Sequence, residues 1–132
     1  MSIFDWQDAY RIDEGMIDAQ HKNLLKIAEK LFNAVLARRD EDHLESCFAE
    51  LLNYTQKHFN EEEAYFERLK TSGLAQHCEE HNVLAKELQK TWDAEKLGFQ
   101  EEPGRLLLNW VEERLLPHMM IEDQEVYSSK GQ

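Results

Sequence analysis

HFNEEEAYFERLKTSGLAQHCEEH, residues 58–81, contains two histidine motifs on either side of a predicted turn. His58 and Glu62 are four residues apart, and His77 and His81 have the same spacing. Residues four apart on a helix are rotated by about 40° and separated by about 6 Å, so each pair lies on one helix face. The TSG between the motifs is typical of a turn. The stretch therefore predicts two neighbouring helices that each present a pair of ligand-type side chains inward.

The 3.6-residue spacing of apolar side chains extends outward from this stretch into four predicted helices. They cover residues 18–38, 41–69, 74–95 and 103–127. Asp18 is predicted to cap the first helix, Gly98 to end the third, and Pro103 to open the fourth. The connections are short and no alternating strand pattern appears. We therefore expect an all-α chain folded as an antiparallel up-down four-helix bundle.

The first 17 residues do not fit a helix, yet Ile3, Phe4, Trp6 and Tyr10 are too apolar for a free tail. We expect residues 1–17 to form an ordered N-terminal arm packed on a bundle of residues 18–127. Residues 128–132 would then be a short tail. At 132 residues the chain has the size of one domain.

The composition argues against several classes of protein. The formal net charge of -12 disfavours binding to nucleic acid and to anionic lipid. Apolar residues make up 42% of the chain, but no run approaches the ~18 apolar residues of a membrane span. The first residues lack the basic and apolar regions of a secretory signal. We expect a soluble, cytoplasmic protein in which Cys47 and Cys78 are free structural thiols.

Five of the six histidines occupy positions that the helical pattern assigns to the core. They are His21, His58, His77, His81 and His118. One core histidine is usually structural, but burying five without partners would cost about 1 to 3 kcal/mol each, comparable in sum to the stability of such a domain. Metal coordination would remove this cost. Imidazoles with two carboxylates suit iron, manganese or zinc, and five imidazoles are too many for one ion with an open position, so we expect two ions.

The fourth predicted helix carries the sequence HMMIED, which places Asp123 five residues after His118. On an ideal helix this spacing rotates the two side chains apart by about 140°. Pro117 precedes the histidine and removes one helical hydrogen bond. If both side chains bind metal, we expect a local distortion of the helix near Pro117.

The ordered pattern of a lone His, HxxxE, HxxxH and HxxxxD on four helices resembles the hemerythrin family, particularly its bacterial single-domain members. The opening FDW and the later IDAQHKNLL also resemble the arm and first ligand helix of that family, so residues 1–132 would be one hemerythrin-like domain. The resemblance implies two iron ions joined by an oxo or hydroxo bridge and by two carboxylates. The implied ligands are His77, His81 and His118 on one iron, His21 and His58 on the other, and Glu62 and Asp123 as bridges.

The resemblance also implies reversible dioxygen binding, for transport or storage rather than catalysis. Dioxygen would bind at the vacant position of the two-histidine iron and be held as hydroperoxide in a pocket that excludes water. The candidate walls of this pocket, which also fit ordinary core packing, are Leu25, Phe59, Leu115 and Met119. Arg114 stands where many relatives carry Trp. If it faced the core, the pocket would be more polar and the irons would be oxidised faster by bound dioxygen.

Alternative interpretations keep the fold but change the function. In one alternative the chain is an oxygen or redox sensing module that acts through a protein partner. In the other it is a di-iron enzyme that handles peroxide or nitric oxide. We expect no fused output domain, which favours a free carrier or store that supplies an oxygen-using enzyme over a sensor. We also expect a monomer. A ferritin-like oxidase needs two Glu-x-x-His pairs, and a zinc peptidase matching HCEEH leaves three core histidines unexplained. The acids flanking the motifs, Glu61, Glu63, Glu79 and Glu80, are expected to point to solvent.

Overall fold

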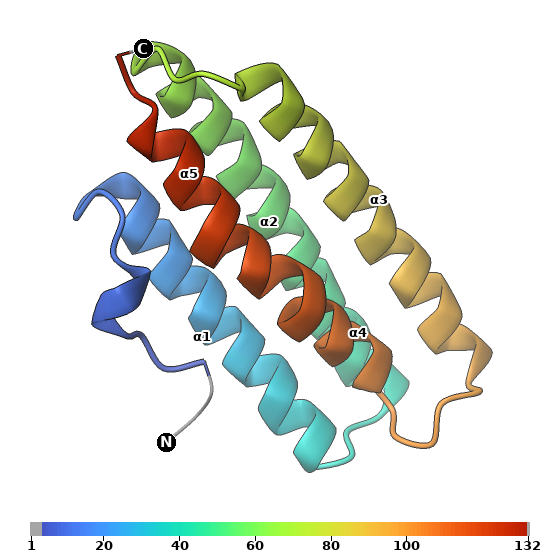
Figure 1. The fold of residues 1–132 in the computed structure, drawn as a ribbon. Coiled ribbons are helices and arrows are strands. Elements are labelled where there is room, and N and C mark those ends of the chain that lie inside the picture. The colour runs from blue at the N-terminus through green and yellow to red at the C-terminus, as the bar shows by residue number, and fades with distance from the viewer. Residues whose placement is uncertain (1–3, 132) are drawn as a thin grey trace.

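The computed structural model describes residues 4–131, and its helices lie side by side as long rods (Figure 1). The first three rods are α1 (Met16–Leu36), α2 (Glu41–Arg68) and α3 (Leu74–Leu97). The fourth consists of α4 (Arg105–Trp110), η2 (Val111–Leu115), η3 (His118–Glu122) and α5 (Asp123–Ser128). α1 and α3 each pack against both α2 and α4, so the rods close around one core. Among residues 4–131 there is no strand, and no helix is long and apolar enough to cross a membrane. The predicted four-helix bundle is confirmed.

The segment before α1 folds back along the bundle as an ordered arm that contains the short 3-10 helix η1 (Asp8–Tyr10). Phe4 is buried, and its ring centroid lies 6.0 Å from that of Phe32 on α1. Trp6 packs edge-on against Tyr10 at 5.7 Å. Aromatic burial therefore holds the arm on the bundle. Ile3, which we also expected here, lies outside the described residues.

The start of α1 differs from the prediction, because α1 begins at Met16 and Asp18 is not its N-cap. The N-cap position is Gly15, and the Asp13 carboxylate, two residues earlier, accepts hydrogen bonds from two backbone N–H groups of the first α1 turn at 3.0 and 3.1 Å. The buried Asp18 carboxylate instead accepts from the backbone N–H groups of Ile12 and Glu14 at 2.8 and 2.9 Å. Asp18 thus ties the arm to α1.

The connection from α3 to the fourth rod turns at two glycines. Gly98 ends α3 with a left-handed φ of 76°, as predicted. The fourth rod begins at Arg105 rather than at the predicted Pro103, because Gly104 has a φ of 86° that no helix contains. A Cβ atom at Gly104 would lie 2.7 Å from the side chain of Val35. The backbone therefore approaches α1 too closely there for any larger residue.

A buried carboxylate on α3 caps the start of α4. Glu95 accepts hydrogen bonds from the backbone N–H groups of Gly104 at 3.1 Å and Leu106 at 2.8 Å. These N–H groups have no partner within the helix. Glu95 therefore links the end of the third rod to the beginning of the fourth.

The fourth rod departs from α-helical geometry on both sides of Pro117. η2 and η3 are π-helical, and the backbone N–H group of Asp123 donates to the carbonyl oxygen of His118, five residues earlier. Pro117 has no N–H group and lies between the two π segments. Because a π turn closes over five residues rather than four, His118 and Asp123 face the same side of the rod. The predicted distortion is confirmed.

The segment after α5 contacts the turn between α2 and α3. The backbone N–H of Gly131 donates to the carbonyl oxygen of Leu69 at 2.9 Å, and that of Ser72 donates to Ser129 Oγ at 2.9 Å. Figure 1 shows the C-terminal end beside this turn. These bonds hold the fourth rod at the end of the bundle where the histidines gather.

Candidate metal centre

All seven predicted ligand residues meet in the half of the bundle that contains the turn between α2 and α3. They are His21 on α1, His58 and Glu62 on α2, His77 and His81 on α3, and His118 and Asp123 on the fourth rod. Each is exposed by 4% or less. The bundle therefore brings together, in its buried interior, a set of residues that are separated by up to 102 positions in the chain.

The nitrogen and oxygen atoms of this set fall into two overlapping groups, each with its atoms within 4.8 Å of one another. The first group contains His77, His81 and His118, the second contains His21 and His58, and both contain Glu62 and Asp123. Two cations that share two carboxylates would need two separate groups of histidines with the same two carboxylates in both, which is the arrangement seen here. It matches the three-plus-two arrangement that the resemblance implies.

Glu62 lies between the two groups. Its Oε1 is 3.0 Å from His77 Nε2 and 3.3 Å from His81 Nε2, and its Oε2 is 3.3 Å from His58 Nε2. Burial raises the pKa of the Glu62 carboxyl, but its close contacts with His21 and these three histidines outweigh burial and hold the pKa well below its usual value. Glu62 is therefore a buried anion with histidines on several sides.

Asp123 is the second shared carboxylate. Its Oδ2 lies 3.0 Å from His21 Nε2, and its Oδ1 lies 2.9 Å from His77 Nε2 and 3.1 Å from His118 Nε2. Burial and the charge of Glu62 raise the pKa of Asp123, but the hydrogen bonds from the histidines outweigh them and lower it. The π turn is what brings Asp123 beside His118.

The same contacts favour positive charge on the histidines. Burial lowers the pKa of His21, but Asp123 and Glu62 outweigh burial and raise this pKa to about 9. The same balance raises the pKa of His77 to about 10. The pKa of His118 is also raised, because Asp123 outweighs the effect of burial. Without metal, protons supply positive charge to this core, and a bound cation would take their place.

Carboxylates outside the predicted set orient two of the imidazole rings. Nδ1 of His81 lies 2.7 Å from Glu63, and Nδ1 of His118 lies 2.7 Å from Glu122. An ionised carboxylate only accepts hydrogen bonds, so each Nδ1 donates. When the rings are neutral, their Nε2 atoms carry lone pairs, and these two atoms face each other at 3.0 Å. Metal-ligating histidines typically have this arrangement.

The geometry of the donors fits a metal ion. Two lone pairs at 3.0 Å repel unless a proton or cation lies between them. With metal–imidazole bonds of about 2.1 Å, two ligands at right angles on one ion lie about 3 Å apart. Three further buried atoms, His58 Nε2, Glu62 Oε2 and Asp123 Oδ1, have no well-aligned hydrogen bond among the described residues. A buried polar atom without a hydrogen bond lowers the stability of the folded protein by about 1 to 3 kcal/mol, and coordination to a metal ion would offset this loss.

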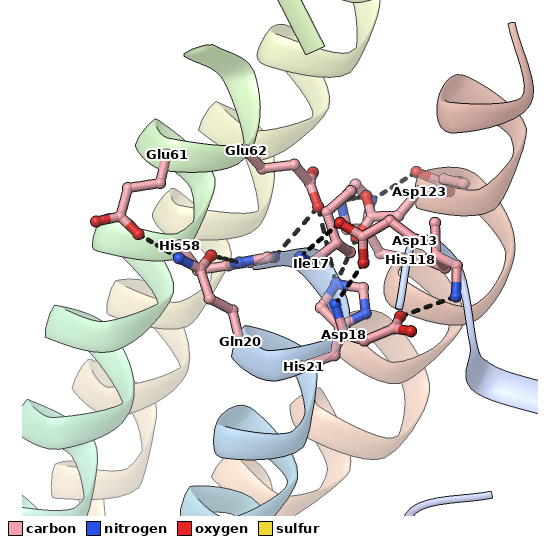
Figure 2. Close-up of polar contacts among 12 residues, drawn as sticks. Asp13, Ile17, Asp18, Gln20, His21, His58, Glu61, Glu62, His118 and Asp123 are labelled. Carbon is pink, nitrogen blue, oxygen red and sulfur yellow. Dashed lines mark hydrogen bonds and ion pairs between the residues drawn. The ribbon is translucent and has the colours of Figure 1, made fainter. Parts of the chain in front are cut away.

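Gln20 orients a third ring, as Figure 2 shows. Its Oε1 accepts from His58 Nδ1 at 2.5 Å, and its Nε2 donates to the carboxylate of Glu61. Because Glu61 accepts only, it determines which end of the Gln20 amide faces the histidine. His58 therefore also presents Nε2 to the interior of the bundle.

These orienting residues were missed by the sequence prediction, and the expectation that Glu61 and Glu63 only face solvent is wrong. Both are half-buried and bonded to side chains of other rods, whereas Glu79 is exposed as expected. Glu122 lies four residues after His118 and was detectable from that spacing. The pairing of the other residues across rods leaves no signal in the local sequence.

The four candidate pocket residues, Leu25, Phe59, Leu115 and Met119, all belong to the buried core. The ring of Phe59 stacks on that of His81 with 3.9 Å between centroids, and its edge meets His118 at 5.8 Å. Leu115 and Met119 lie on the two π segments. Leu25 also lines a cavity of about 260 Å³ beneath the arm. Phe59 thus packs against two histidines of the three-histidine group, and its ring centroid also lies 6.0 Å from that of His58.

Arg114 faces solvent rather than the core. Its side chain is 43% exposed, and its Nε donates to Glu87 on α3 at 2.8 Å. Because Arg114 does not face the core, it does not make the pocket more polar. Trp110, one turn earlier, is buried.

Comparisons with known proteins agree with this geometry. The profile described as "Hemerythrin HHE cation binding domain" matches residues 14–128. A protein named Bacteriohemerythrin from Clostridium acetobutylicum is 26% identical over 124 residues, covering 86% of this chain and 94% of that protein. A Bacteriohemerythrin from Methylococcus capsulatus is 24% identical over 115 residues, covering 84% and 87%. A Hemerythrin-like protein from Naegleria gruberi is 30% identical over 97 residues, covering 71% and 76%. No solved structure gave a significant match.

Proposed function

Because the chain belongs to the hemerythrin family, we propose that it binds dioxygen reversibly at a pair of iron ions. The observation that carries this proposal is the meeting of five imidazoles and two shared carboxylates in one buried cluster. Imidazole and carboxylate donors in this ratio suit iron, and the overlapping groups suit two ions. When bound, a reduced iron pair would supply the electrons that hold dioxygen.

The unequal division of the histidines supports an open position on one side of the pair. We assign His77, His81 and His118 to one ion, His21 and His58 to the other, and the two carboxylates to both. The side with two histidines has fewer protein donors. We therefore place the dioxygen position there.

The apolar surroundings support binding without turnover. Phe59, Leu115 and Met119 are each exposed by 3% or less, and the ring of Phe59 packs against His81 and His118. A dry site limits the protons and water that would divert bound dioxygen. Both fully buried carboxylates already contact several histidines, so neither is free to act as a separate proton donor. These features favour a carrier or store over an enzyme.

The test is a reversible change in colour. The metal-free protein is loaded with Fe²⁺ without oxygen, exposed to air and then placed under vacuum, and its visible spectrum is followed through repeated cycles. A band that appears with dioxygen and disappears under vacuum is expected for the wild type and for His43→Ala, whose histidine lies outside the cluster. His58→Ala should lose the reversible band.

Three results would overturn the proposal. An absent or irreversible band would exclude a carrier. Sustained consumption of peroxide or nitric oxide would favour an enzyme. A protein partner that binds only one oxygenation state would favour a sensor.

A further inference from the structure

The Nδ1 partners of the histidines differ between the two groups. On the three-histidine side, His81 and His118 each donate to a carboxylate, Glu63 and Glu122, at 2.7 Å. On the two-histidine side, His58 donates to the neutral amide of Gln20. No hydrogen-bond partner of His21 Nδ1 is found within residues 4–131. The two sides therefore differ in the group that accepts directly from Nδ1 as well as in the number of imidazoles, because the carboxylate of Glu61 reaches His58 only through the Gln20 amide.

This difference should change how strongly the rings bind a cation. A carboxylate that accepts from Nδ1–H draws the proton toward itself and leaves more electron density on Nε2, so the ring becomes a stronger donor. A neutral amide orients the ring but pulls less on its proton. Loss of such outer partners typically weakens metal binding by about 10-fold to 100-fold. Two carboxylate-backed rings on one side therefore add to the effect of its extra histidine.

We propose that Glu63 and Glu122 are positioning residues that make the three-histidine position the tighter one, so that cations fill it first and the two-histidine position second. This inference rests on the proposed pair of metal positions. Its consequence is that the position where we place dioxygen is completed last.

The placement of these carboxylates makes the inference testable. The side chains of Glu63 and Glu122 are 28% and 43% exposed. Each also lines a surface cavity, of about 230 Å³ between α2 and α3 for Glu63 and about 360 Å³ beside the α2–α3 turn for Glu122. Replacing either by Gln keeps its size and opens no apolar space. Glu63 and Glu122 lie on different rods, so a folding defect in one variant would not affect the test made with the other.

The experiment is a titration of the metal-free protein with Co²⁺ in competition with a chelator, followed by visible absorption. The wild type should bind two equivalents in two steps that differ by about 10-fold or more in affinity. Glu63→Gln and Glu122→Gln should each weaken the first step by about 10-fold to 100-fold and leave the second nearly unchanged. Gln20→Leu should weaken only the second step. Glu79→Gln, which removes the same charge from an exposed side chain without a ligand contact, should change neither.

Each alternative result has a definite meaning. Two equal steps in the wild type, equal weakening of both steps by Glu63→Gln, or an effect of Glu79→Gln as large as that of Glu63→Gln would overturn the inference and leave the metal pair standing. Uptake of one cation or none by the wild type would overturn the paired centre, and with it the proposed function. Far-UV circular dichroism of each variant establishes that the helices are intact.

Discussion

Asp123→Asn would test whether this carboxylate stabilises the bundle before any metal is bound. Asp123 is fully buried, with His77 Nε2 at 2.9 Å, His21 Nε2 at 3.0 Å and His118 Nε2 at 3.1 Å from its oxygens. Asn has nearly the same size, so no cavity forms, but one oxygen becomes an NH₂ group that faces a histidine donor. Removing one partner from a buried ion pair costs about 3 to 5 kcal/mol. That is a large part of the roughly 5 to 15 kcal/mol that stabilises a typical domain.

The assay is urea unfolding at pH 7 in the presence of a chelator, followed by circular dichroism. Asp93→Asn is the matched control, because its side chain is 59% exposed; its free energy of unfolding should change by less than about 0.5 kcal/mol. Added Fe²⁺ should stabilise the wild type more than Asp123→Asn, since Asp123 belongs to both ligand groups. If metal-free Asp123→Asn unfolds within about 1 kcal/mol of the wild type, the buried carboxylate is not a stabilising partner of the histidines.

Three further substitutions test other parts of the structure. Glu95→Ala should lower the free energy of unfolding by about 2 kcal/mol, because it leaves backbone N–H groups at the start of α4 without an acceptor. Glu101→Ala is the control, since Glu101 is exposed. Equal urea midpoints for the two variants would contradict the capping role of Glu95. Burial raises the pKa of Asp13, but hydrogen bonds from three backbone N–H groups outweigh burial and hold the pKa below its usual value. The ionised Asp13 carboxylate therefore stabilises the folded protein above the unfolded-state pKa, and this stabilisation is lost as pH falls through the folded-state pKa. Asp13→Asn should therefore be about 1 kcal/mol less stable at pH 7, a deficit that shrinks below about pH 4 in urea titrations; a constant deficit would contradict the role of the charge. Arg114→Ala removes the exposed ion pairs with Glu87 and Glu80, so its stability should change by less than about 1 kcal/mol and the iron-loaded protein should autoxidise at the wild-type rate. Faster or slower autoxidation would show that Arg114 affects the centre.

The ends of the helices were less predictable than the helices themselves. A capping residue is recognised by type, and both Asp13 and Asp18 have a suitable side chain ahead of the apolar pattern. Only the path of the arm decides that Asp13 accepts from the first turn of α1 while Asp18 accepts from the arm. The start of the fourth rod is similar, because Pro103 suits a first turn but the close approach of Gly104 to Val35 delays the helix.

The four helices and the seven candidate ligands could be predicted from the sequence alone. His58 with Glu62, and His77 with His81, can be paired without a structure because the geometry of one helix decides which side chains share a face. The five-residue spacing of His118 and Asp123, next to Pro117, also predicted a local distortion of the helix, which the structure shows to be a π turn.

The hydrogen-bond partners of those ligands, and the neighbouring residues that face solvent, depend on how the rods pack and could not be predicted from the sequence. The bonds from Glu63 to His81 and from Glu61 through Gln20 to His58 join different rods, and the outward turn of Arg114 depends on Glu87 of α3. Such contacts depend on the rotation and axial register of one rod against another, which hydrophobic periodicity leaves undetermined.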